Sequence, residues 1–171
     1  MSRYRRLSII AFVILVLDQV TKLYVDTNFR LHETVPVIDG FFHLTYVRNK
    51  GAAFGILADN AVRIPFFITV SSIAMLGILW YIKRIRDDQK LVYFALSLIF
   101  SGAFGNLIDR IRYGEVIDFL DVFWKSHHWP AFNVADSAIT IGVTLLFIEM
   151  WFEDRNKSAT LRAHKSEERN L

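Results

Sequence analysis

The residues of this chain that are best suited to chemistry are acidic side chains close to long apolar stretches. Five of them occur between residues 109 and 136: Asp109, Glu115, Asp118, Asp121 and Asp136. Two carboxylates that share a site of low dielectric constant cannot both ionise easily, so such a pair holds one proton between them. The ionised member can act as a general base on water, and the protonated member can act as a general acid toward a carbonyl oxygen or a departing amine. The sequence therefore permits hydrolysis by an aspartate pair.

Spacing alone does not identify the pair. Several of these acids could instead cap helices or pair with basic residues, and Asp109 beside Arg110 is the most obvious such candidate. The chain has no cysteine, which excludes thiol nucleophiles and Cys-ligated metal centres, and it has no GxSxG motif. The adjacent His127 and His128 would point in different directions and have no evident third ligand. We therefore do not expect these histidines to form a metal site.

Four apolar blocks must position these acids. Each is about 18–19 residues long, which suffices to cross a hydrocarbon core of about 30 Å as a helix. The chain is 53% hydrophobic, against roughly 45–50% in soluble domains. Its first block begins like a signal peptide, but polar residues follow without a small-x-small cleavage site, so we expect a retained helix. The sequence predicts an all-α polytopic membrane protein with four transmembrane helices, at 7–25, 64–82, 91–108 and 134–152.

The distribution of lysine and arginine predicts how the helices are oriented. The N-terminal end, the 83–90 loop and the 153–171 tail contain twelve such residues in 33 positions, whereas segments 26–63 and 109–133 contain seven in 63. Basic loops stay in the cytoplasm. We therefore expect both termini to be cytoplasmic and the two long loops to lie outside.

The first outer loop should add a small β-element to the helices, at about 35–56. Its segment 41–47 is aromatic and β-branched and follows an Asp-Gly turn signal, which indicates a short strand or hairpin. Segment 51–55, Gly-Ala-Ala-Phe-Gly, would let a ligand approach the backbone closely. We expect residues 1–152 to form one transmembrane domain and residues 153–171 to form a charged cytoplasmic tail, either a frayed helix or disordered.

This topology brings polar residues from distant parts of the chain to the outer membrane interface. They are Asp18 and Lys22 of the first helix, Asn106, Asp109 and Arg110 of the third, Asp118 after it, and Asn133 and Asp136 at the start of the fourth. Ionisable residues at membrane depth are costly, which makes them functional candidates.

Five short motifs in these segments occur in order along the chain. They are Asp18-Gln19-x-Thr21-Lys22, Asn49-x-Gly51-Ala52-Ala53-Phe54-Gly55, Gly102-Ala103-x-Gly105-Asn106-x-Ile108-Asp109-Arg110, Val116-Ile117-Asp118-Phe119 and Phe132-Asn133-x-Ala135-Asp136-Ser137. Each motif alone is weak. Together, on a chain with four spans, they resemble the lipoprotein signal peptidase family, also called signal peptidase II. One departure is Ser101 before Gly102, where the family commonly has a Gly-Gly pair, and this change should be tolerated.

The resemblance implies that Asp118 and Asp136 are the catalytic aspartates. It assigns substrate binding to Asn49, Gly51, Asn106, Arg110 and Asn133, and support of the site to Asp18, Lys22 and Asp109. It also implies that the outer β-element is a small cradle on the membrane. The implied activity is that of an endopeptidase in the bacterial inner membrane. Its substrate would be a prolipoprotein that carries a diacylglyceryl group on a cysteine, and cleavage would occur just before that cysteine without a cofactor.

Two other functions remain open from the residues alone. A proton-coupled carrier could use the same carboxylates, but it should present polar groups along a whole path, and these helices are polar mainly near their outer ends. A non-catalytic assembly partner would need no cluster of acids and amides at one level. Nucleic acid is not an expected partner, because the basic residues flank apolar blocks. We expect a monomer surrounded by membrane lipid, with Trp129 in an interfacial aromatic belt rather than in a substrate pocket.

Overall fold

The computed structural model describes residues 3–51, 62–86 and 88–168. This part of the chain contains four long helices: α1 (Arg3–Asn28), α2 (Arg63–Ile82), α3 (Lys90–Tyr113) and α4 (Val134–Glu168). All four are long and apolar enough to cross a membrane, which confirms the predicted four-helix fold. The small-residue stretch at 52–55 lies outside the described residues.

The helices are longer than the apolar blocks that predicted them. Hydropathy marks only the part of a helix that suits lipid, whereas backbone hydrogen bonding continues into the polar flanks. Helix α3 therefore carries Asp109 and Arg110 within its last turns. It ends where Gly114 adopts a left-handed conformation with φ of 70° and donates its N–H to the carbonyl oxygen of Arg110 at 3.0 Å. Helix α4 continues to Glu168, so the backbone of the tail is helical over most of its length.

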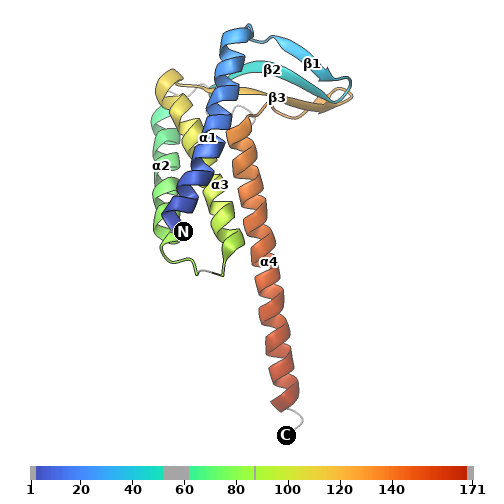
Figure 1. The fold of residues 1–171 in the computed structure, drawn as a ribbon. Coiled ribbons are helices and arrows are strands. Elements are labelled where there is room, and N and C mark those ends of the chain that lie inside the picture. The colour runs from blue at the N-terminus through green and yellow to red at the C-terminus, as the bar shows by residue number, and fades with distance from the viewer. Residues whose placement is uncertain (1–2, 52–61, 87, 169–171) are drawn as a thin grey trace.

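A four-stranded antiparallel sheet lies at one end of the helical bundle (Figure 1). Its strands follow the order β1 (Thr34–Ile38), β2 (Phe42–Asn49), β3 (Val116–Trp124) and β4 (His127–His128). The strand predicted at 41–47 corresponds to β2. Strand β3, which was not predicted, pairs with β2 so that Val47 lies opposite Asp118 and Asn49 lies opposite Val116. The sheet thus brings together the two long loops that the sequence predicts to lie outside.

Both ends of the described chain and the α2–α3 connection lie at the end of the bundle away from the sheet (Figure 1). This is the arrangement expected if the basic segments share one side of the membrane and the sheet lies on the other.

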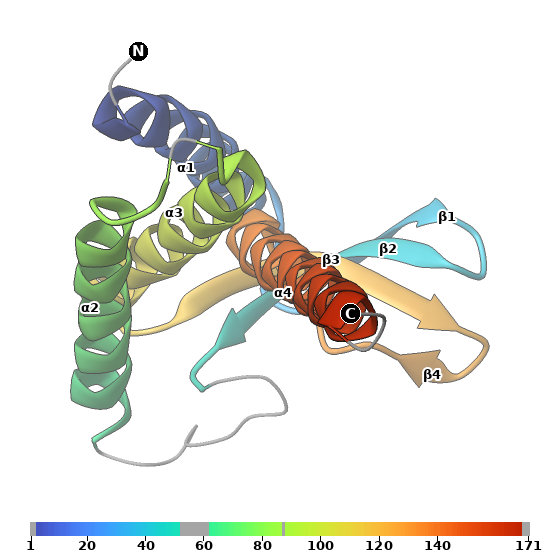
Figure 2. The ribbon, with the colours of Figure 1, turned by 90° about the horizontal axis from the view of Figure 1, so that it is seen from below.

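Helix α3 is the centre of the bundle. Viewed from below it lies between α2 and α4, and α1 packs beside it (Figure 2). Twelve of its 24 residues are buried, whereas in α2 only Ile78 and Ile82 are. One core cluster joins the helices near the end away from the sheet and includes Leu7, Ile82 and Tyr93. A second cluster fastens the sheet to α1 and consists of Val25, Tyr46, Ile117 and Phe119.

Polar contacts strengthen the packing of the sheet against α1. Nη2 of Arg48 on β2 donates to Oδ1 of Asp26 on α1 at 2.6 Å, and the hydroxyl of Tyr46 donates to the same oxygen. The Arg48 guanidinium also lies over the ring of Tyr113, 4.8 Å from its centroid. These contacts fix the end of β2, and therefore Asn49, relative to α1 and α3.

Glycines let α3 and α4 approach each other closely. A Cβ atom added to Gly102 would lie 2.2 Å from the carbonyl oxygen of Ala135, and one added to Gly142 would lie 2.6 Å from that of Ala95. By contrast, a Cβ atom at Gly77 of α2 would meet nothing within 4 Å. Close packing of this kind is a main source of helix association in lipid.

We predict that Gly142→Ala destabilises the protein by about 1–3 kcal/mol, because its methyl group overpacks the α3–α4 contact. Thermal unfolding of the purified protein in detergent measures this loss. Gly77→Ala is the matched control and should be neutral or slightly stabilising, because alanine is the better helix former. Equal melting temperatures for Gly142→Ala and the wild type would contradict the packing described here.

Candidate active site

Asp118 is the third residue of β3, and this strand places its side chain at the site. Its side chain is almost fully buried, with 1% of the residue exposed. Nδ2 of Asn49, at the end of the neighbouring β2, donates to its Oδ2 at 2.9 Å. Nδ2 of Asn133 donates to its Oδ1 at 2.7 Å. Both carboxyl oxygens of Asp118 therefore accept hydrogen bonds from amide groups of other segments.

Asp136 lies in the first turn of α4, where a capping box holds it. The backbone N–H of Asn133 points to Oδ2 of Asp136 at 3.3 Å, and Oδ1 of Asn133 accepts the backbone N–H of Asp136 at 2.8 Å. This reciprocal pair satisfies donors that a helix start would otherwise leave free. Oδ1 of Asp136 accepts a further bond from Nδ2 of Asn106 on α3 at 2.7 Å.

Asn133 connects the two aspartates. It is completely buried, its side-chain amide binds Asp118, and its backbone N–H and side-chain oxygen both bind Asp136. A single residue thus holds a strand carboxyl and a helix carboxyl next to each other. The two carboxyl groups are close enough for the charge of Asp136 to act on Asp118.

The environment of Asp118 favours its protonated form. Burial, and in second place the negative charge of Asp136, raises the pKa of Asp118 from 3.8 to about 7, although the amides of Asn49 and Asn133 act in the opposite direction. Asp118 can therefore carry a proton at near-neutral pH.

A buried ion cluster lies next to the pair. Nζ of Lys22 contacts Oδ2 of Asp18 at 2.9 Å and Oδ2 of Asp109 at 2.9 Å, and all three residues are at most 2% exposed. Nε2 of Gln19 donates to both carboxylates at 3.1 Å. The sequence predicted that Asp18, Lys22 and Asp109 would meet near the site. The sequence analysis gave no role to Gln19. Its position directly after Asp18 was the signal that could have indicated one.

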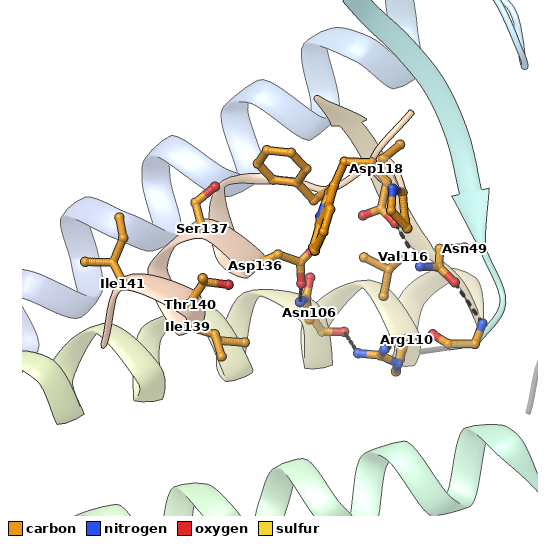
Figure 3. Close-up of a pocket in the computed structure, with 15 residues that line it drawn as sticks. Asn49, Asn106, Arg110, Val116, Asp118, Asp136, Ser137, Ile139, Thr140 and Ile141 are labelled. Carbon is orange, nitrogen blue, oxygen red and sulfur yellow. Dashed lines mark hydrogen bonds between the residues drawn. The ribbon is translucent and has the colours of Figure 1, made fainter. Parts of the chain in front are cut away.

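A cavity of about 610 Å³ opens in front of the two aspartates (Figure 3). This size suits a ligand of several residues or a lipid-like group. Asp118 and Asp136 line it together with Asn49, Gly51, Asn106 and Arg110, and Asn133 lies behind the carboxylates. Apolar side chains of α4 and of the segment before it, among them Ile139, Ile141 and Phe132, complete the lining. Trp129, for which the sequence favoured an interfacial belt, also lines this cavity.

Arg110 projects from the last turns of α3 toward the end of β2. Its Nη1 donates to the carbonyl oxygen of Asn106 at 3.3 Å, and its Nη2 lies 3.5 Å from the carbonyl oxygen of Gly51. The guanidinium also lies over the ring of Phe67 on α2, 4.6 Å from its centroid. Arg110 thus connects three segments around the cavity.

The other acids of region 109–136 lie outside the cavity. Oδ1 of Asp121 on β3 is 2.9 Å from Nδ1 of His128, and Glu115 is 4.0 Å from Nζ of Lys50. Among the described residues no group of three or more His, Cys, Asp or Glu side chains could hold a metal ion.

A family model described as signal peptidase (SPase) II matches residues 10–152 of this chain. The chain belongs to the signal peptidase II family. It is 57% identical over 155 residues to the lipoprotein signal peptidase of Geobacter metallireducens, an alignment that covers 91% of this chain and 96% of that protein. The lipoprotein signal peptidase of Bacillus pumilus is 43% identical over 147 residues, covering 86% and 93% of the two chains.

The fold agrees with this membership. A bacterial membrane enzyme solved by the in meso method at 2.3 Å superposes with a TM-score of 0.81 and 36% identity, over 89% of this chain and 91% of the other. The resemblance drawn from five short motifs is therefore confirmed. Signal peptidase II proteins are membrane aspartic proteases, which is the class of chemistry that a pair of buried carboxyl groups can perform.

We predict that Asp118→Asn gains stability relative to the wild type as the pH rises. Because the pKa of Asp118 is raised in the folded protein, the stability that its neutral form contributes is complete below pH ~4 and is lost as the pH rises through about 7. Asparagine is neutral throughout. The difference in unfolding free energy between variant and wild type should therefore grow by roughly 2–4 kcal/mol between pH 4 and pH 8. Thermal unfolding at both pH values measures this change, and a constant difference would contradict the buried, protonated state of Asp118.

Proposed function

We propose that this protein is a membrane aspartic endopeptidase that cleaves the signal peptide from diacylglyceryl-modified prolipoproteins, just before the lipidated cysteine. Asp118 and Asp136 are its catalytic pair. The observation that carries this proposal is the connection of the two carboxyl groups through Asn133, at the wall of a cavity that also has an apolar side. Membership of the signal peptidase II family supports the reaction and the class of substrate.

The reaction follows from a pair that holds one proton. The ionised carboxylate removes a proton from a water molecule as its oxygen attacks the scissile carbonyl carbon, and the protonated carboxyl group donates to the carbonyl oxygen. The C–N bond then breaks: the cysteine nitrogen takes up a proton from the pair, and a hydroxyl group of the tetrahedral intermediate returns one to it. One water molecule is consumed, and the products are a carboxylic acid on the signal peptide and a free amine on the lipidated cysteine. The pair ends with one proton, as it began.

The cavity offers partners for an unwound substrate. A signal peptide crosses the membrane as a helix whose backbone groups bond to each other, so the scissile bond must become extended before it can be attacked. The side chains of Asn49, Asn106 and Arg110 and the carbonyl of Gly51 line the cavity and supply polar groups in place of the lost helical bonds. The apolar α4 wall at Ile139 and Ile141 suits the acyl chains of the diacylglyceryl group.

The protein acts in the bacterial inner membrane with both termini in the cytoplasm and the active site at the extracytoplasmic face. The basic residues of the N-terminal end, the α2–α3 connection and the tail support this orientation. It works as a monomer, since one chain supplies every residue assigned here to the catalytic pair and its amide partners.

We predict that Asp118→Asn and Asp136→Asn each lower the cleavage rate at least ~10³-fold while the proteins stay folded, because each removes one member of a unit that works only as a pair. The assay follows release of the signal peptide from a diacylglyceryl-modified prolipoprotein by purified protein in detergent, with mass spectrometry of the new N-terminus. Asp121→Asn is the matched control, because Asp121 lies on the same strand as Asp118 but contacts His128 outside the cavity. It should keep near wild-type activity.

Retained turnover by both pair variants would contradict the assignment of the catalytic residues. Binding of the prolipoprotein by a folded wild type without any cleavage would contradict the peptidase function itself and would favour an assembly role.

We also predict that kcat/KM falls as the pH rises past neutrality. Catalysis needs one protonated and one ionised carboxyl group, and Asp118, with its pKa raised to about 7, loses its proton there. A rate profile between about pH 5 and pH 9 should show this alkaline fall with a midpoint near 7, as a property of the pair. An undiminished rate at pH 9 would contradict proton donation by Asp118.

A further inference from the structure

Lys22 is a buried cation that the reaction scheme does not use. It projects from α1, is 2% exposed, and does not line the cavity in front of the catalytic pair. Its Nζ atom has three acceptors, which match the three N–H groups of an ammonium ion: Asp18 Oδ2 at 2.9 Å, Asp109 Oδ2 at 2.9 Å and Asn106 Oδ1 at 3.0 Å. The first two neutralise its charge, but the third is a side chain of the catalytic site.

The carboxyl groups of Asp18 and Asp109 around Lys22 are fixed in place by further hydrogen-bond donors. Asp18 also accepts the backbone N–H of Ala135 at 3.0 Å and a bond from Gln19, and Asp109 also accepts the backbone N–H of Ile117 at 3.3 Å and a bond from Gln19. Every one of these contacts is with a donor. The ammonium group of Lys22 is therefore anchored by two fixed anions, and its third N–H has a fixed direction.

That third N–H determines which way the side chain of Asn106 faces. An amide group can present either its oxygen or its NH₂ group, and the neighbours decide between them. An ammonium ion can only donate, so the amide atom next to Lys22 must be Oδ1. Nδ2 of Asn106 then faces Oδ1 of Asp136, at 2.7 Å.

Asn133 alone cannot secure this orientation. Its Nδ2 atom also reaches Oδ1 of Asn106, at 3.2 Å, but the same two N–H groups face Asp118 at 2.7 Å and the carbonyl oxygen of Ile117 at 3.2 Å. Three acceptors compete for two hydrogens, and the carboxyl group of Asp118 has the shortest contact. Lys22 is the donor with a hydrogen left for Asn106.

We propose that Lys22 is a positioning residue for catalysis: it locks the amide of Asn106 so that its NH₂ group holds Asp136 in the ionised, water-activating form, and the shared proton then resides on Asp118. This inference rests on the proposed function. It assigns Asp136 as the general base and Asp118 as the general acid. The residue that determines this division, Lys22, lies on α1 and outside the cavity.

A double-mutant cycle tests the proposal through prolipoprotein cleavage. Lys22→Met should lower kcat ~10- to 100-fold, by analogy with the loss seen when a side chain that orients a metal ligand is removed. KM should change little, because Lys22 does not line the cavity. Asn106→Leu removes the group through which Lys22 acts. The double variant should then have the kcat of Asn106→Leu alone, within about threefold, since the two residues act in one path.

Multiplied effects of Lys22→Met and Asn106→Leu would overturn the proposal, because a residue that only stabilises the fold does not act through Asn106. The control for such a role is Asp26→Asn, which weakens another contact between α1 and the sheet and should combine multiplicatively with Asn106→Leu. If Lys22→Met does not fold, the double variant Lys22→Met, Asp109→Asn replaces it, because this variant keeps the net charge of the cluster. Its kcat is then compared with that of the single variant Asp109→Asn. An equal kcat in those two proteins would likewise overturn the proposal.

The same experiment separates this inference from the proposed function. A wild type that does not cleave the prolipoprotein removes both. A wild type that cleaves, with multiplied effects in the cycle, removes the role of Lys22 and leaves the peptidase intact.

Discussion

A carboxylate removed from water must be given other hydrogen-bond donors, and this requirement shapes the end of the bundle that carries the sheet. Asp18, Asp109 and Asp118 are each at most 1% exposed. A buried charge without hydrogen-bond partners costs several kcal/mol, and side chains so deeply buried in the protein are out of reach of bulk water. The partners come from distant parts of the chain: an ammonium group and an amide on α1, an amide on β2, and backbone N–H groups at the start of α4 and of β3. Satisfying these carboxylates therefore fixes where the elements meet.

The four aspartates fall into two groups with different chemistry. Asp18 and Asp109 share the charge of Lys22 and belong to the framework of the bundle. Within the described part of the chain, Asp118 and Asp136 accept hydrogen bonds from neutral amide and backbone donors alone, and they face a cavity. A pair that is buried but has no cation in direct contact must relieve its repulsion by retaining a proton. In the proposed mechanism, the absence of a cation beside this pair is what lets it exchange protons with a substrate.

Much of this arrangement could be predicted from the sequence. Hydropathy located all four helices, and their alternation placed the polar residues of the first, third and fourth helices at one level. The motifs named both aspartates and their amide neighbours. Strand β3 was missed, because Val116–Trp124 follows α3 directly and its pairing with β2 depends on residues about 70 positions away, as in the pair Val47 and Asp118. The position of Asn133 between the two carboxyl groups was equally inaccessible. It depends on a helix start and a strand meeting in space, which local pattern does not encode.

The central claim is that Asp118 and Asp136 hold one proton between them at neutral pH. Infrared difference spectroscopy of the purified protein measures this directly, because a protonated carboxyl group and a carboxylate absorb at separate frequencies. On titration from about pH 6 to pH 9, we predict the loss of one carboxylic acid band with a midpoint near 7, and the absence of this band in the double variant Asp118→Asn, Asp136→Asn. A wild-type spectrum with no such band above pH 6, or a band that persists in the double variant, would contradict the account.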